Sequence, residues 1–157
     1  MQFTRELGTM QSPESVYEYL SDAARFGRLF PHCERVELHQ PTGFTVSIAV
    51  GTSQFQGSLD LHMECPEAII PRFIRYTGRG EAAANQITMD IAFDIAANGD
   101  GSHVICYCRA DVNGFISFFG SDVADSLGRK KLDELVENLR MELARPERGG
   151  ASSHTSV

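Results

Sequence analysis

Two cysteines, Cys106 and Cys108, are spaced closely enough to act together in chemistry. They lie two residues apart in a run of alternating residues, so both side chains point to the same face of a strand. A metal site would require Cys-x-x-Cys pairs or a nearby histidine, and a nucleophilic cysteine requires a neighbouring base. Neither pattern is present, so we interpret both residues as small buried apolar side chains in a reducing cytosol. We predict no metal and no cofactor.

Among the histidines, His32 is the candidate for a functional role. It follows the second expected helix, beside the expected mouth of a pocket, whereas His62 and His103 share the polar parity of their strands. Two interpretations of His32 stay open: an exposed loop residue, or a contact to the headgroup of a bound ligand. General acid–base catalysis needs a titratable group within hydrogen-bond reach of the substrate. The inward parity of the strands carries no histidine or carboxylate, so we predict no catalytic residues and a protein that is not an enzyme.

Basic residues give little support to a nucleic-acid or nucleotide site. The formal net charge is −7, whereas a nucleic-acid surface needs a basic stripe. The cluster Arg129-Lys130-Lys131 is either a solvated helix face or a contact for anionic lipid headgroups or an acidic partner. The segment Gly78-Arg79-Gly80 lacks the strand-to-helix context of a phosphate loop, and we interpret it as a hairpin end.

Strands dominate the elements that must position these residues. From Phe44 to Ile95, apolar and polar residues alternate over several segments, a period that predicts antiparallel strands with one buried and one wet face. Asn98-Gly99-Asp100-Gly101 is the strongest hairpin signal. Expected strands span 2–10, 34–40, 44–51, 54–65, 72–79, 86–96 and 103–112.

Three helices are expected beside these strands. Ser12-Pro13-Glu14 combines an N-cap, a proline at the first helical position and an acid in the first turn. A second short helix runs from Ser21-Asp22 to about Leu29. The helical period then returns from about Ser117 to Arg145. On one face of this last helix, small residues (Ala124, Gly128) precede a run of leucines.

This order of elements predicts an α+β helix-grip fold, in which a strongly bent antiparallel sheet surrounds one long C-terminal helix. The small residues of that helix allow two arrangements: close packing on the sheet, or a pocket. We expect one domain over residues 1–145 and a disordered tail over residues 146–157, which has no apolar pattern.

With this order of elements, the chain resembles the SRPBCC (START/Bet v1-like) superfamily and, within it, the CoxG family of carbon monoxide dehydrogenase subunits. The resemblance covers about residues 2–144. The family usually has Pro-Gly-Cys where this chain has Pro31-His32-Cys33, and Gly-Gly where it has Asn113-Gly114. The resembling segments are Phe30-Pro31-His32-Cys33-Glu34, Val50-Gly51, Phe55-x-Gly57, Gly78-x-Gly80, Gly99-Asp100-Gly101, and Gly114 with Gly120.

The resemblance implies a non-catalytic accessory protein that binds a hydrophobic small molecule, lipid or quinone-like, between the sheet and the last helix. Its implied partner is a molybdenum hydroxylase of carbon monoxide dehydrogenase type, served in maturation, membrane recruitment or quinone supply. The alternatives are a small helix-grip enzyme of cyclase or hydrolase type, a polyketide- or ubiquinone-carrier-type protein, and an interaction module with a collapsed pocket.

The expected location is the cytoplasm, with peripheral contact at the inner face of the membrane left open. No apolar run approaches the ~20 residues needed to span a bilayer, and the N-terminus does not have the pattern of a secretion signal. Some relatives carry an apolar C-terminal anchor, which this tail lacks.

We expect the ligand-binding residues to be Phe30, His32, Phe55, Leu59, Met63, Tyr76, Met89, Phe93, Cys106, Cys108, Phe119, Ala124 and Gly128.

Overall fold

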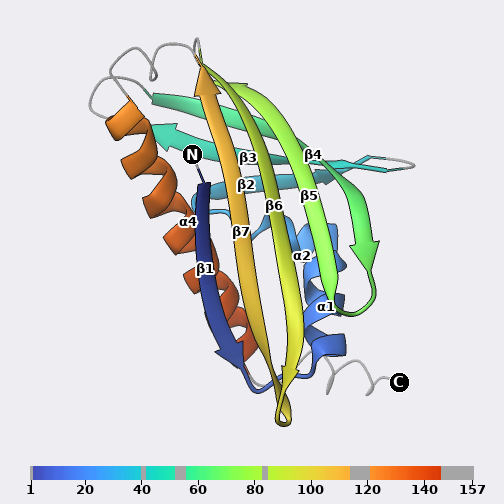
Figure 1. Cartoon of the computed structure of the whole chain (residues 1–157). Coiled ribbons are helices and arrows are strands. Elements are labelled where there is room, and N and C mark those ends of the chain that lie inside the picture. Colours follow the sequence, from blue (N-terminus) through green and yellow to red (C-terminus); the bar gives the residue numbers. More distant parts are fainter. Residues whose placement is uncertain (1, 40–41, 52–55, 83–84, 114–120, 146–157) are drawn as a thin grey trace.

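The computed structural model of the chain describes residues 2–39, 42–51, 56–82, 85–113 and 121–145. These residues form one seven-stranded antiparallel sheet with the order β1-β7-β6-β5-β4-β3-β2, together with three helices (Figure 1). The elements are β1 (Gln2–Thr9), α1 (Pro13–Ser21), α2 (Ala23–Gly27), β2 (Cys33–Leu38), β3 (Phe44–Gly51), β4 (Gln56–Ile69), β5 (Phe73–Ala82), β6 (Asn85–Asn98), β7 (Gly101–Asn113) and α4 (Ser121–Ala144).

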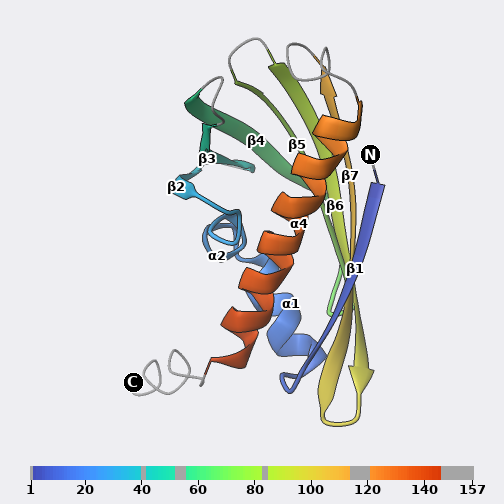
Figure 2. The ribbon, with the colours of Figure 1, turned by 90° about the vertical axis from the view of Figure 1, so that its left-hand side faces the viewer.

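The predicted helix-grip architecture is confirmed. Figure 2 shows α4 running along one face of the bent sheet, with α1 and α2 on the same side. We call this the inner face and the opposite one the outer face. No helix in the described part of the chain is both long enough and apolar enough to cross a membrane. The expected tail, 146–157, lies outside the described residues.

One strand extends well past its predicted end. β4 continues through Pro66 to Ile69, and its pairing with β5 shifts register between Glu64 and Glu67. Proline cannot donate a ladder hydrogen bond, and a bulge is one of the few places in a sheet that tolerates it. The prediction ended this strand at Cys65 because it treated Pro66 as a breaker.

The two short helices begin where the capping residues predict. Ser12 Oγ accepts a hydrogen bond from Ser15 N (3.2 Å), and Pro13 is the first helical residue. Asp22 serves both helices, because its backbone N–H donates to Tyr19 O at the end of α1 and its Oδ1 accepts from Arg25 N at the start of α2. One residue therefore both ends α1 and begins α2.

The C-terminal half of α4 closes the core. Its leucines are buried against the inner face, as predicted, and Asn138 Nδ2 donates to Leu29 O (2.9 Å). On the side of β1, Arg5 Nε donates to Asp133 Oδ1, and the Arg129 guanidinium lies 5.2 Å from the centre of the Phe3 ring. The buried leucines of α4 are Leu132, Leu135, Leu139 and Leu143.

Strand β3 departs from the expected pattern of one wet face. Thr45 and Ser47 have outward parity, yet both side chains are buried. The longer side chains of β4 explain this, because Thr45 Oγ1 lies 3.1 Å from His62 Nδ1, and Ser47 Oγ donates to Asp60 Oδ1 (2.7 Å). The small polar side chains of β3 are thus covered by the longer side chains opposite them on β4.

Candidate functional site

The inward-facing side chains are less buried toward the end of the sheet that faces the N-terminal half of α4. On β6, Phe93 and Ile91 are fully buried, whereas Met89 and Ile87 are only half-buried. On β7, burial decreases in the same direction, from Val104 to Val112. The interior is therefore closed at the end near α1 and less tightly covered at the other.

An aromatic cluster fills the closed end. The Phe26 ring of α2 stacks on Tyr76, with ring centroids 4.2 Å apart, and meets Phe30, Phe44 and Phe93 edge-on. Tyr76 OH donates a hydrogen bond to Leu20 O (2.6 Å). The expected ligand contacts Phe30, Tyr76 and Phe93 are thus brought together, but around a protein side chain.

Sequence reasoning missed Phe26. Its signal was present, because Phe26, Leu29 and Phe30 have the i, i+3, i+4 spacing of residues that share one helix face. A ligand that reached Tyr76 or Phe93 would first have to displace the Phe26 ring.

Thioethers and glycines border the less covered end. Met89 lies directly opposite Gly78 in the register of β5 and β6. Met63 is almost fully buried, and its Sδ would lie 2.3 Å from a Cβ placed on Gly78, so Met63 fills the space that Gly78 leaves. Leu59 is buried on the same face. Methionine side chains adapt readily to irregular shapes, so this end can change its packing at low cost.

The remaining expected contacts are distributed unevenly. Gly128 is half-exposed on α4, while Ala124 lies in α4 with its side chain outside the described residues. Phe55 and Phe119 also lie outside them. His32 is exposed, precedes β2 and adopts φ 60°, and its carbonyl accepts from Ala49 N (3.0 Å).

Burial determines the state of the inward thiols. It raises the pKa of Cys106, and it raises the pKa of Cys108 to about 11, with the charge of Asp90 adding to the effect. Both thiols therefore stay protonated at neutral pH, a state that disfavours nucleophilic attack. Within the described ranges, no three His, Cys, Asp or Glu side chains are grouped so as to hold a metal ion.

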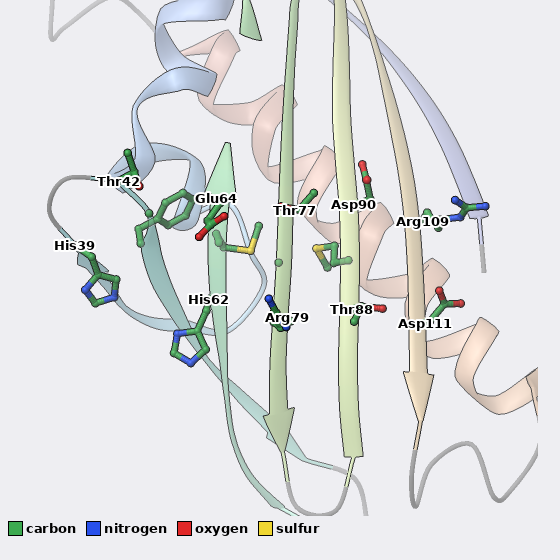
Figure 3. A pocket seen from close by; sticks show the side chains of 15 residues that line it. His39, Thr42, His62, Glu64, Thr77, Arg79, Thr88, Asp90, Arg109 and Asp111 are labelled. Atoms are coloured by element: carbon green, nitrogen blue, oxygen red, sulfur yellow. The ribbon is translucent and has the colours of Figure 1, made fainter. Parts of the chain in front are cut away.

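A separate hollow of about 650 Å³ lies on the outer face, over β3 to β7. Polar side chains dominate its lining (Figure 3). His39 and His62 stand on one side of it, and Arg109 and Asp111 on the other, with Arg79 between them. Its lining also includes Phe44, Met63 and Met89, which have inward parity.

One protein-family model matches most of the chain. The model of the CoxG family, a family of carbon monoxide dehydrogenase subunits, matches residues 6–144. No curated protein sequence matches the chain significantly.

Solved structures share the fold at low sequence identity. A conserved protein from Geobacillus kaustophilus has a TM-score of 0.79 at 14% identity, covering 91% of this chain and 95% of that one. A START superfamily protein from Mycobacterium smegmatis has a TM-score of 0.68 at 12% identity, covering 90% and 96%. The di-domain ARO/CYC StfQ from the steffimycin biosynthetic pathway has a TM-score of 0.63 at 12% identity, covering 89% of this chain and 49% of that one.

Proposed function

Because the chain belongs to the CoxG family of carbon monoxide dehydrogenase subunits, we propose that it is a non-catalytic accessory protein that binds a hydrophobic small molecule. The proposed site lies between the sheet and the N-terminal half of α4. The observation that carries this proposal is the loss of burial toward that end, where Met89 and Ile87 are half-buried apolar side chains with inward parity. Leu38, which pairs with Phe44 on the inner face, is 57% exposed and would stand at the rim.

The chemistry of the inner face favours binding over catalysis. The described strand residues that pair and face inward include no histidine and no carboxylate. Their one charged side chain is Arg5, which forms an ion pair with Asp133 of α4. The thiols of Cys106 and Cys108 are kept neutral by burial. Without a group able to move a proton, the site offers shape and apolar contact only.

Apolar contact alone is sufficient for useful affinity. Each buried CH₂ contributes about 0.8 kcal/mol, so about ten such groups give roughly 8 kcal/mol, the scale of a micromolar dissociation constant before ordering costs. An isoprenoid or acyl chain of a quinone or lipid has that many. We therefore place the ligand in the lipid or quinone-like class.

The family assignment also supports a partner. We propose that the protein serves a molybdenum hydroxylase of carbon monoxide dehydrogenase type, in maturation, membrane recruitment or quinone supply, from the cytoplasm or the inner face of the membrane. Co-purification of the tagged protein with that enzyme from the native cell would support this assignment. Recovery of the protein alone, from cells that produce the enzyme, would contradict it.

A second candidate is a small enzyme of cyclase type, which the likeness to a biosynthetic ARO/CYC protein favours. The two candidates differ in what the site does to its ligand. Incubation of the protein with a ligand that it binds, followed by mass spectrometry, separates them, since a carrier returns the ligand unchanged.

The binding proposal is tested by titration with a panel of quinones and fatty acids. We expect saturable binding in the wild type and a loss of about tenfold or more in Met89→Lys, because a charge in an apolar site is costly to desolvate. Gln86→Lys is the matched control, since Gln86 is exposed and has outward parity on the same strand. Absence of saturable binding, or equal effects of the two variants, would contradict the proposal.

A further inference from the structure

The outer-face hollow contains a corner where cationic and hydrogen-bonding groups converge. It is formed by His39 after β2, His62 of β4 and Arg79 of β5 (Figure 3). We propose that this corner binds an oxyanion, a phosphate or a carboxylate, on the face of the sheet opposite the apolar site.

The strand register places the groups of this corner in one row. Thr45 pairs with His62, His62 with Arg79, and Arg79 with Thr88, so all four side chains project from the outer face. Directly opposed residues in antiparallel strands have Cβ atoms about 5 Å apart. One small anion can therefore contact the imidazole and the guanidinium together.

A buried hydroxyl fixes the two imidazoles. Thr45 Oγ1 lies 2.7 Å from His39 Nε2 and 3.1 Å from His62 Nδ1, and Thr45 is only 5% exposed. A hydroxyl has one proton, so Thr45 donates to one ring and accepts from the other. The outer nitrogens are His39 Nδ1 and His62 Nε2. In neutral rings, the ring that accepts from Thr45 has its N–H on the outer nitrogen and can donate to an anion, whereas the outer nitrogen of the other ring is an acceptor. These rings are positioned before any ligand arrives.

Arg79 lacks a counter-ion within the described part of the chain. Arg75, on the same face of the same strand, pairs with Asp90 (2.8 Å) and Glu67 (3.4 Å). Arg79 is exposed, and none of the carboxylates in the described ranges lies within ion-pair distance of it. A guanidinium presents a planar fork of donors that matches a carboxylate or phosphate. Its cross-strand neighbour His62 cannot neutralise it, but a bound anion can.

Acidic residues limit the site to this corner. Asp90 of β6, diagonal to Arg79, and Asp111 of β7 also line the hollow, and Asp90 is ion-paired with Arg75, which also pairs with Glu67. Carboxylates occupy both adjacent rows of the outer face, Glu64 on one side and the pair Asp60 and Glu81 on the other, and they repel a second negative charge. Thr77 and Thr88 also line the hollow and add two hydroxyls to it. We expect a single small oxyanion group to fit, rather than a polyanion.

The test uses the full-length protein and inorganic phosphate, with acetate as the carboxylate probe, at an ionic strength held constant with chloride. Side-chain NMR resonances of His39, His62 and Arg79 report binding. We expect saturable shifts, and an apparent Kd that is about tenfold weaker in Arg79→Gln, because a charge-assisted hydrogen bond is lost. Arg109→Gln is the matched control, since Arg109 lines the far side of the same hollow.

A second variant addresses the positioning role of Thr45. Thr45→Val keeps the size of the side chain but removes the hydroxyl, so both imidazoles lose their common partner. We expect weaker phosphate binding with Arg79 unchanged. Shifts that only follow ionic strength, or equal binding by wild type and Arg79→Gln, would overturn the proposal.

Vesicles distinguish the two sources of such an anion. Binding to vesicles with anionic phospholipid but not to zwitterionic ones, and its loss in Arg79→Gln, supports the proposal and assigns a lipid headgroup. Saturable phosphate binding without vesicle binding supports it and assigns a soluble ligand. Absence of both overturns it. Titration of the same variants with a quinone, which carries no carboxylate, should be unchanged, so failure of this proposal and failure of the apolar site are distinguishable.

Discussion

At the scale of single residues, His32 is the clearest case of a side chain that its backbone does not favour. It has φ 60°, in the left-handed region that costs an L-residue about 1–2 kcal/mol relative to glycine. The resemblance to the CoxG family implies glycine at this position. The left-handed backbone before β2 favours glycine, which accounts for a glycine in the family. Backbone conformation does not account for the histidine of this chain.

We expect His32→Gly to stabilise the protein by about 1 kcal/mol, which raises Tm by roughly 2–4 °C for a chain of this size. A thermal melt measures this, with His32→Ala as the control, because alanine removes the imidazole but keeps the Cβ. If His32→Gly instead lowered Tm, the imidazole would have to make stabilising contacts. A loss of ligand binding with Tm raised would identify His32 as a headgroup contact.

The buried thiol of Cys108 makes stability depend on alkaline pH. Its pKa rises from an ordinary 9.0 to about 11 because of burial. Between these two values the unfolded chain has released the thiol proton while the folded chain still binds it, so the free energy of unfolding falls as pH rises. Below pH 9 this contribution is fully present.

Urea unfolding at pH 8.5 to 11 should show this decrease. Cys108→Ala should show a shallower decrease over the same interval, since one titrating group is removed. Equal slopes in the two proteins would mean that the thiol is accessible to water in the folded state.

At the scale of elements, the sequence predicted most of the fold, and what it missed had local causes. Alternation and turn residues together located the strands, and the Ser12 and Asp22 caps located both short helices. The burial of Thr45 and Ser47 on the outer face was missed. Alternation predicts which face a side chain points to, but not whether longer neighbouring side chains cover it. The extension of β4 was missed because Pro66 indicates a breaker unless a bulge absorbs it.

The candidate site was predicted less completely than the fold. Sequence parity placed Met63, Tyr76 and Phe93 on the inner face, but the residue that packs among Tyr76 and Phe93 is Phe26, from an element far away in sequence. Likewise, the corner of His39, His62 and Arg79 joins three segments. Contacts of this kind depend on register and helix docking, which a period of two does not specify.

Gly80 of β5 lies where the backbone of β4 approaches closely. A Cβ at this position would lie 2.3 Å from the backbone oxygen of Asp60, an atom that cannot move without moving the strand. We expect Gly80→Ala to destabilise the protein by about 1–3 kcal/mol. Gly57→Ala on β4 is the control, since nothing lies within 4 Å of its added Cβ. Thermal melts of both variants test this, and equal Tm values would contradict it.

At the scale of the whole molecule, the choice lies between a pocket and a closed core beside the N-terminal half of α4. The small residue Ala124 is the most direct probe. If a hollow is present there, Ala124→Leu occupies the space of the ligand without strain, so Tm holds or rises while quinone or fatty-acid binding falls. If the helix packs closely on the sheet, the same change costs about 1–3 kcal/mol.

One melt and one titration distinguish these outcomes, and we expect Tm to hold. Lys130→Leu is a useful control for helix propensity alone, because Lys130 is exposed on the same helix. A large fall in Tm for Ala124→Leu, with Lys130→Leu unaffected, would favour the interaction module with a collapsed pocket.

The anchoring of α4 has a consequence for motion. Buried leucines and the Asn138 bond hold its C-terminal half, and the Phe3 and Arg5 contacts hold its middle to β1. Local opening is rare where many buried contacts must be lost, so amide hydrogen exchange should be slow from Leu132 to Leu143. A guest held against this half of α4 could leave past it only by a large unfolding event, so escape by that route would be slow.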